Sequence, residues 1–111
     1  MYALLILLLL RVEQPMESGI TKEMEMMAIQ EGYTELKRLY KYDNTEFYRK
    51  AILGEIKLLK ITCDQGNGFD LIFTALWNFE TSYLNRGKDK ITDILLKELG
   101  EAIKVERRKK Q

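Results

Sequence analysis

The chain has 111 residues, of which 46% are hydrophobic and 32% charged, and its formal net charge is +1. This length suits a single domain over residues 1–111, with enough apolar side chain for one modest core. The balanced charge excludes a strong overall attraction to nucleic acid or anionic lipid, so any electrostatic partner must be recognised by a local cluster.

Residue types that common catalytic and metal sites need are scarce. The sequence has no histidine and one cysteine, Cys63. Histidine is the usual general base near neutral pH and the commonest metal ligand, and a single thiol cannot form an intramolecular disulfide. We therefore expect no enzymatic activity, no cofactor and no bound metal. The low cysteine content favours a reducing compartment, so the predicted location is the cytoplasm.

The first element is an apolar N-terminal segment, residues 1–12, with an unbroken apolar run from Tyr2 to Leu10. As a helix this run spans about 14 Å, well short of the ~30 Å hydrocarbon core, so no transmembrane span is predicted. The features of a signal peptide are lacking around it. Helix, strand and signal remain open, as does a start at Met1 or Met16. Because the run has no polar face, we predict partner contacts there, at Leu5, Leu7 and Leu9.

The first predicted helix covers residues 21–42, and Thr21 is placed to cap it. Large side chains recur at intervals of three and four residues, which puts them on one helix face. This apolar stripe comprises Met26, Ile29, Tyr33, Leu36 and Tyr40. Gly32 lies in the middle and costs about 1 kcal/mol relative to alanine in a continuous helix, so the sequence allows a kink or break there.

A turn at residues 43–45 precedes the second predicted helix, residues 46–62, with Asn44 or Thr45 as its cap. Its apolar stripe comprises Ile52, Ile56, Leu59 and Cys63. Because Cys63 continues this stripe and has Asp64 beside it, we interpret it as a buried structural thiol. Residues 64–68, rich in glycine, form a strong break.

Residues 69–84 form the third predicted helix, the most apolar and aromatic of the four. Its stripe comprises Phe69, Ile72, Phe73, Leu76, Phe79 and Tyr83, and Trp77 lies beside it. Gly87 is a candidate left-handed cap after it. The fourth predicted helix covers residues 89–109, with Asp89 as its cap. Its stripe comprises Ile91, Leu95, Leu99 and Ile103, flanked by Ile94 and Leu96.

Four amphipathic helices separated by short breaks predict an all-α fold, a small antiparallel four-helix bundle. One alternative is an α+β fold, because Asn67-Gly68 is typical of tight hairpin turns. Residues 56–63 and 69–76 would then be the two strands. The spacing of three and four residues favours the all-α fold.

Two patterns invite a chemical interpretation. The loop Gly66-Asn67-Gly68 lacks the spacing and the basic residues of a phosphate-binding loop, so an ordinary turn explains it better. Paired glutamates such as Glu31 with Glu35 and Glu98 with Glu101 lie among lysines and arginines, which is typical of a solvated helix surface.

The apolar and aromatic side chains exceed what one small bundle is expected to enclose. The leading hypothesis is therefore a small, non-enzymatic protein-interaction or regulatory protein that recognises a protein partner through apolar helix faces and forms a homodimer. Besides the N-terminal leucines, the predicted contact residues are Tyr42, Tyr48 and Trp77.

The alternative hypothesis is a nucleic-acid-binding accessory protein. A basic C-terminal tail covers residues 104–111, and a second basic patch is interleaved with tyrosines, the combination that single-stranded nucleic acid platforms use. The residues proposed for this role are Lys37, Arg38, Lys41, Arg107, Arg108, Lys109 and Lys110.

Overall fold

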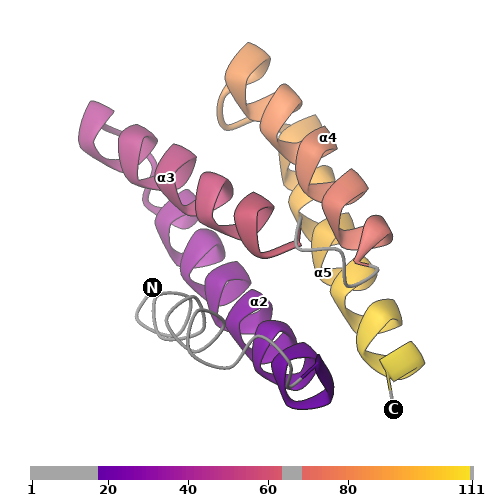
Figure 1. The fold of residues 1–111 in the computed structure, drawn as a ribbon. Coiled ribbons are helices and arrows are strands. Elements are labelled where there is room, and N and C mark those ends of the chain that lie inside the picture. The colour runs from indigo at the N-terminus through magenta and orange to yellow at the C-terminus, as the bar shows by residue number, and fades with distance from the viewer. Residues whose placement is uncertain (1–17, 64–68, 111) are drawn as a thin grey trace.

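The computed structural model describes residues 18–63 and 69–110, which form four helices and no strand. These are α2 (Ser18–Lys41), α3 (Glu46–Cys63), α4 (Asp70–Arg86) and α5 (Lys90–Lys110) (Figure 1). The predicted all-α bundle is confirmed. The alternative hairpin is wrong, because residues 56–63 belong to α3 and residues 70–76 to α4.

The helices are arranged as two hairpins. α2 packs along α3 and α4 packs along α5, while α3 against α4 and α2 against α5 join the hairpins to each other (Figure 1). The short loops at residues 42–45 and 87–89 make the helices of each hairpin antiparallel.

Local sequence sets several helix ends. Thr45 Oγ1 accepts a hydrogen bond from the Tyr48 N–H, and Asp89 Oδ1 accepts one from the Ile91 N–H, so both predicted caps are confirmed. Gly87 follows α4 with a φ of 67°, which favours glycine, and its N–H donates to the Tyr83 carbonyl. Its ψ of −146° differs from that of the predicted left-handed cap. The cap predicted at Thr21 is wrong, since α2 already begins at Ser18.

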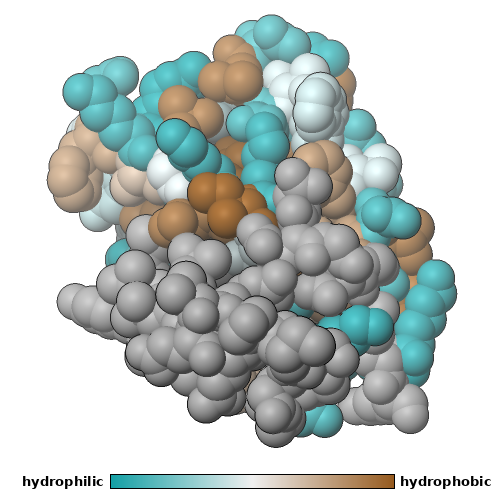
Figure 2. Space-filling view, viewed as in Figure 1, coloured by the Kyte–Doolittle hydropathy of each residue, from teal (hydrophilic) through white to brown (hydrophobic). Residues whose placement is uncertain are grey.

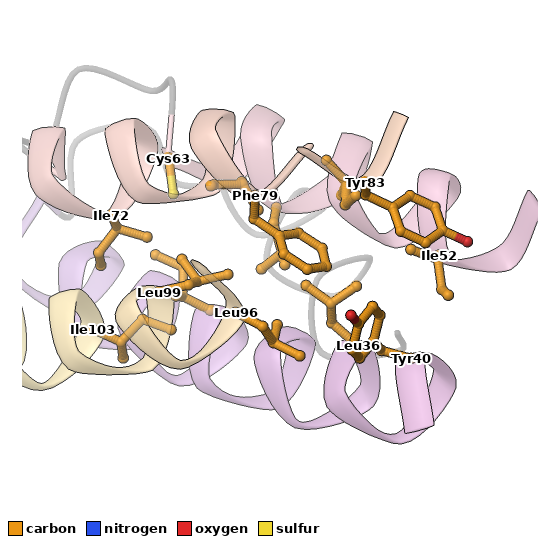
Figure 3. Close-up of a cluster of buried hydrophobic side chains, with 14 of the residues drawn as sticks. Leu36, Tyr40, Ile52, Cys63, Ile72, Phe79, Tyr83, Leu96, Leu99 and Ile103 are labelled. Atoms are coloured by element: carbon orange, nitrogen blue, oxygen red, sulfur yellow. The ribbon is translucent and has the colours of Figure 1, made fainter. Parts of the chain in front are cut away.

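All four helices contribute to the core, which is built from the predicted stripes (Figure 3). Phe79 and Tyr83 of α4 stack on each other with ring centroids 6.1 Å apart, and Tyr40 of α2 meets Phe79 edge-on at 5.7 Å. Leu36 and Ile52 are fully buried beside them. Each such side chain contributes about 1.5–3 kcal/mol when it leaves water.

The predicted stripe of α5 is wrong at its first turn. Ile91 is 47% exposed and Ile94 is exposed too, whereas Thr92 is completely buried. The Thr92 hydroxyl lies 2.7 Å from the Ser82 hydroxyl of α4, so a buried hydrogen bond satisfies both groups. The buried face of α5 therefore begins at Thr92 and continues at Leu96, one residue later than the spacing of the isoleucines suggested.

Gly32 and Gly100 are sites of close helix packing. α2 runs unbroken through Gly32, where a Cβ atom would lie 2.6 Å from Leu59 Cδ2 of α3. At Gly100 of α5, a Cβ atom would lie 2.8 Å from Cζ of Tyr33 in α2. The absent side chains let neighbouring helices approach, and no break in α2 accompanies Gly32.

Candidate interaction surfaces

The outer side of α4 is free of charge between its ends. We call this surface the α4 outer face. Its exposed residues are Leu71, Thr74, Trp77, Asn78, Thr81, Leu84 and Asn85. The exposed positions of α2, α3 and α5 all include charged residues. On the molecular face in Figure 2, hydrophobic residues reach the surface among hydrophilic ones. Charge depletion on one helix face is typical of the centre of a protein–protein interface.

Trp77 is the largest group on the α4 outer face and is 54% exposed. Lys60 of α3 places its Nζ atom 5.3 Å from the centroid of the indole ring and forms an ion pair with Glu80 at 3.0 Å. These contacts hold one side of the ring against the protein and leave the other side to solvent. The indole is thus fixed in place with about half of its surface exposed.

A shallow groove of about 320 Å³ runs between α4 and α5 beside Trp77. Ile91 and Leu95 of α5 form its apolar part, and Asn78, Thr81 and Asn85 of α4 supply hydrogen-bonding groups. The groove extends the apolar surface of α4 onto α5. The lining also includes Arg86, so the groove combines apolar, uncharged polar and one basic side chain, a mixture that is usual for a binding surface.

The structure does not bring all the predicted contact residues together. Tyr42 is 51% exposed and Tyr48 is partly buried, and both lie near the loop between α2 and α3. Trp77 contacts Lys60 near the other end of α3, which is about 20 Å away at 1.5 Å per residue. Leu5, Leu7 and Leu9 lie outside the described residues.

Phe47 is the most exposed large apolar residue among those described, at 75%. It was not among the predicted contact residues. Its ring meets that of Tyr48 edge-on with centroids 5.7 Å apart, so the two aromatic residues form a small exposed pair at the start of α3. The exposure of Phe47 could have been predicted, because its distance in sequence from Ile52 does not fit the spacing of three or four residues that defines the buried stripe of α3.

A basic groove of about 340 Å³ lies between α2 and α5. It brings together Lys37, from the predicted basic patch, and Arg107, from the predicted basic tail. Lys104, from the same predicted tail, and Lys97, which sequence reasoning missed, add two cations. Glu101 is the one acidic residue in the lining and lies 3.4 Å from Lys104 Nζ. Contacts between helices distant in sequence create this cluster, so no local pattern could show it.

The remaining basic residues are arranged differently. Arg38 donates to both carboxylate oxygens of Glu35, at 2.7 and 2.8 Å, and these hydrogen bonds lower the pKa of Glu35 below its ordinary value. Lys41 Nζ lies 5.6 Å from the centroid of the Tyr42 ring. Arg108 and Lys109 are exposed on α5, while the side chain of Lys110 lies outside the described residues.

A third groove, of about 420 Å³, lies between α2 and α3. Its lining residues are Glu35, Arg38, Leu39, Phe47, Tyr48, Ala51, Gly54, Glu55 and Leu58. Glu55 is only 1% exposed, and its Oε2 atom has no hydrogen-bond partner. Burial, with a smaller contribution from the negative charge of Glu35, raises the pKa of Glu55 to about 7. Sequence reasoning missed this buried carboxyl group.

Neither a metal site nor a membrane span is found in residues 18–63 and 69–110. No three acidic, cysteine or histidine side chains there are grouped to hold a metal ion. None of the helices α2 to α5 combines the length and the apolar character that crossing a bilayer requires. Comparisons of the chain with protein-family models, with curated proteins and with solved structures gave no match.

Proposed function

We propose that this protein is a small, non-enzymatic interaction protein that forms a homodimer through the α4 outer face. The observation that carries the proposal is that no exposed position of α4 between Asp70 and Arg86 is charged, in a chain of which 32% is charged. Interface centres are depleted in charge, and tryptophan is the residue most enriched among those that dominate binding energy. The single thiol supports the cytoplasm as the proposed location.

A second copy of the chain suits this face better than a charged partner does. A twofold axis places residues near their own copies, so a lysine or glutamate close to the axis would repel itself. Threonine and asparagine side chains both donate and accept hydrogen bonds, and so can pair with a second copy of themselves. Thr81 and Asn78, beside Trp77, have this property.

The size of α4 sets a requirement on the dimer. Its 17 residues extend about 25 Å, which at a width near 10 Å offers on the order of 250 Å². A stable interface buries about 800 Å² on each partner. The proposed footprint therefore includes the groove and the exposed Ile91 of α5.

Sedimentation velocity tests the proposal, with Trp77 fluorescence as a second signal because Trp77 is the sole tryptophan. We expect a dimer of the 13.1 kDa chain at high concentration and a shift of the emission to shorter wavelength as it forms. The variant Thr81→Lys should be monomeric, because it places two like charges in the interface. The matched control Thr34→Lys, on exposed α2 surface, should dimerise normally.

Two results would refute the homodimer. One is a wild-type protein that stays monomeric at the highest concentration it tolerates. The other is a Thr81→Lys variant that remains folded by circular dichroism and dimerises as well as Thr34→Lys.

The groove between α2 and α5 favours nucleic-acid binding as a second candidate function. Four basic side chains around one groove can contact phosphates, and each contact adds a salt-dependent contribution to affinity. Binding to a generic single-stranded oligonucleotide should fall steeply with salt, and Arg107→Gln should weaken it and reduce the salt dependence. Absence of a gel shift at low salt would remove this candidate.

A further inference from the structure

The buried carboxyl group of Glu55 lies at the groove between α2 and α3. Its Oε2 atom would lie 3.5 Å from a Cβ atom on Gly32, which is ordinary van der Waals contact, so the carboxyl group lies against α2 at this glycine. The side chain is 99% removed from solvent, and this oxygen accepts no hydrogen bond. A buried acceptor without a donor costs free energy, which a ligand that supplies the donor would recover.

The rest of the groove is suited to an apolar molecule. Leu39 of α2 and Ala51 and Leu58 of α3 form aliphatic walls, and the rings of Phe47 and Tyr48 stand at one end. The volume of about 420 Å³ falls within the range of small-molecule sites, roughly 300–1,000 Å³.

The charges of the groove select for a cation. Arg38 compensates the Glu35 carboxylate through two hydrogen bonds, whereas Glu55 Oε2 has no hydrogen-bond partner among residues 18–63 and 69–110. An anionic ligand would meet two carboxylates, and a neutral one would leave the Glu55 charge uncompensated. An ammonium group supplies both the missing donor and the opposite charge.

We propose that this groove binds a small primary amine with an apolar body, with the ammonium group donating to Glu55 and the body between Leu58 and the Phe47–Tyr48 pair. The site is independent of the α4 outer face and of the proposed dimer. Glu55 titrates near pH 7, with Glu35 and Arg38 of α2 as the charged groups lining the same groove. Amine affinity is therefore higher at pH 8 than at pH 6, where Glu55 is mostly protonated.

Calorimetric titration of the full chain with 2-phenylethylamine and with 2-phenylethanol at pH 8 tests the site. The alcohol has nearly the same shape and no charge, so we expect it to bind at least tenfold more weakly. Glu55→Gln keeps the shape of the side chain and removes the charge, and should weaken amine binding about tenfold or more. The matched control Glu98→Gln changes an exposed glutamate of α5 and should leave binding unchanged.

A second variant keeps the test decisive if Glu55→Gln does not fold. Gly54 is exposed at the groove with no atom within 4 Å of a Cβ, so Gly54→Leu fills the groove without touching the core. It should abolish amine binding. The proposal is overturned if the wild-type protein does not bind the amine, if the alcohol binds equally well, or if folded Glu55→Gln or Gly54→Leu protein binds the amine as tightly as the wild type.

Discussion

Replacing Gly100 by alanine should destabilise this protein, although alanine is favoured over glycine by about 1 kcal/mol inside a helix. The new Cβ atom would lie 2.8 Å from Tyr33 Cζ and 3.0 Å from Cε2, inside contact distance of a rigid ring. The ring must then move away. Its hydroxyl donates to the Leu96 carbonyl at 3.0 Å, and this hydrogen bond would be lost.

The magnitude follows from three contributions. Overpacking of a helix contact costs about 1–3 kcal/mol. Loss of the Tyr33 hydrogen bond costs about 0.5–1.5 kcal/mol. Subtracting the gain of about 1 kcal/mol in helix propensity leaves a net loss of roughly 0.5–3.5 kcal/mol in the free energy of unfolding.

Two other glycines provide the comparison. Gly54→Ala meets nothing within 4 Å and should stabilise the protein by about 0.5–1 kcal/mol. Gly32→Ala places a Cβ atom 2.6 Å from Cδ2 of the buried Leu59 and should destabilise it by about 1 kcal/mol.

Urea unfolding monitored by circular dichroism measures these changes. In a Tyr33→Ala background the obstacle to the new side chain is gone, so Gly100→Ala should become stabilising there. Equal effects of Gly100→Ala and Gly54→Ala in the wild-type background would refute the reasoning, as would a Gly100→Ala effect that does not depend on Tyr33.

Three further predictions concern single groups. The pKa of Glu55 is about 7 in the folded protein and 4.5 in its ordinary state, so the unfolded chain loses the proton at lower pH than the folded one does. The free energy of unfolding should therefore fall by on the order of 3 kcal/mol between pH 5 and 8. Urea unfolding at several pH values should show this fall, and Glu55→Gln should reduce it. Tyr83→Phe removes a 2.8 Å hydrogen bond to Asp43, and thermal unfolding should show a loss of about 1–2 kcal/mol. Thr45→Ala removes the cap of α3 and should cost about 1 kcal/mol in the same assay, whereas Asn44→Ala should change little.

The helices could be predicted because their stripes and caps are local patterns. Ile52, Ile56 and Leu59 recur at helical spacing and are all buried, and Thr45 and Asp89 cap as expected. Where two registers fit one helix, periodicity cannot choose between them. In α5 the hydrogen bond between the small side chains of Thr92 and Ser82 accompanies the register that buries Thr92 and exposes Ile91.

Buried charge and grooves between helices could not be predicted. Glu25, Glu55 and Glu106 are all buried, although glutamates on a lysine-rich helix are normally solvated. The meeting of Lys37 with Arg107 depends on how α2 packs on α5. The charge-free side of α4, by contrast, is visible in the sequence once the helix is assigned, since Glu80 is the one charged residue between Asp70 and Arg86.

The division into two hairpins bears on how the chain reaches its fold. Most packing joins helices that are neighbours in sequence, so each hairpin can assemble after closing only a short loop, which is the topology of fast-folding proteins. The Tyr83–Asp43 and Lys88–Lys41 hydrogen bonds connect the two turns and require both hairpins to be in place. We expect these cross-links to form after the rate-limiting step, so that Tyr83→Phe accelerates unfolding in a chevron plot and leaves the folding rate nearly unchanged.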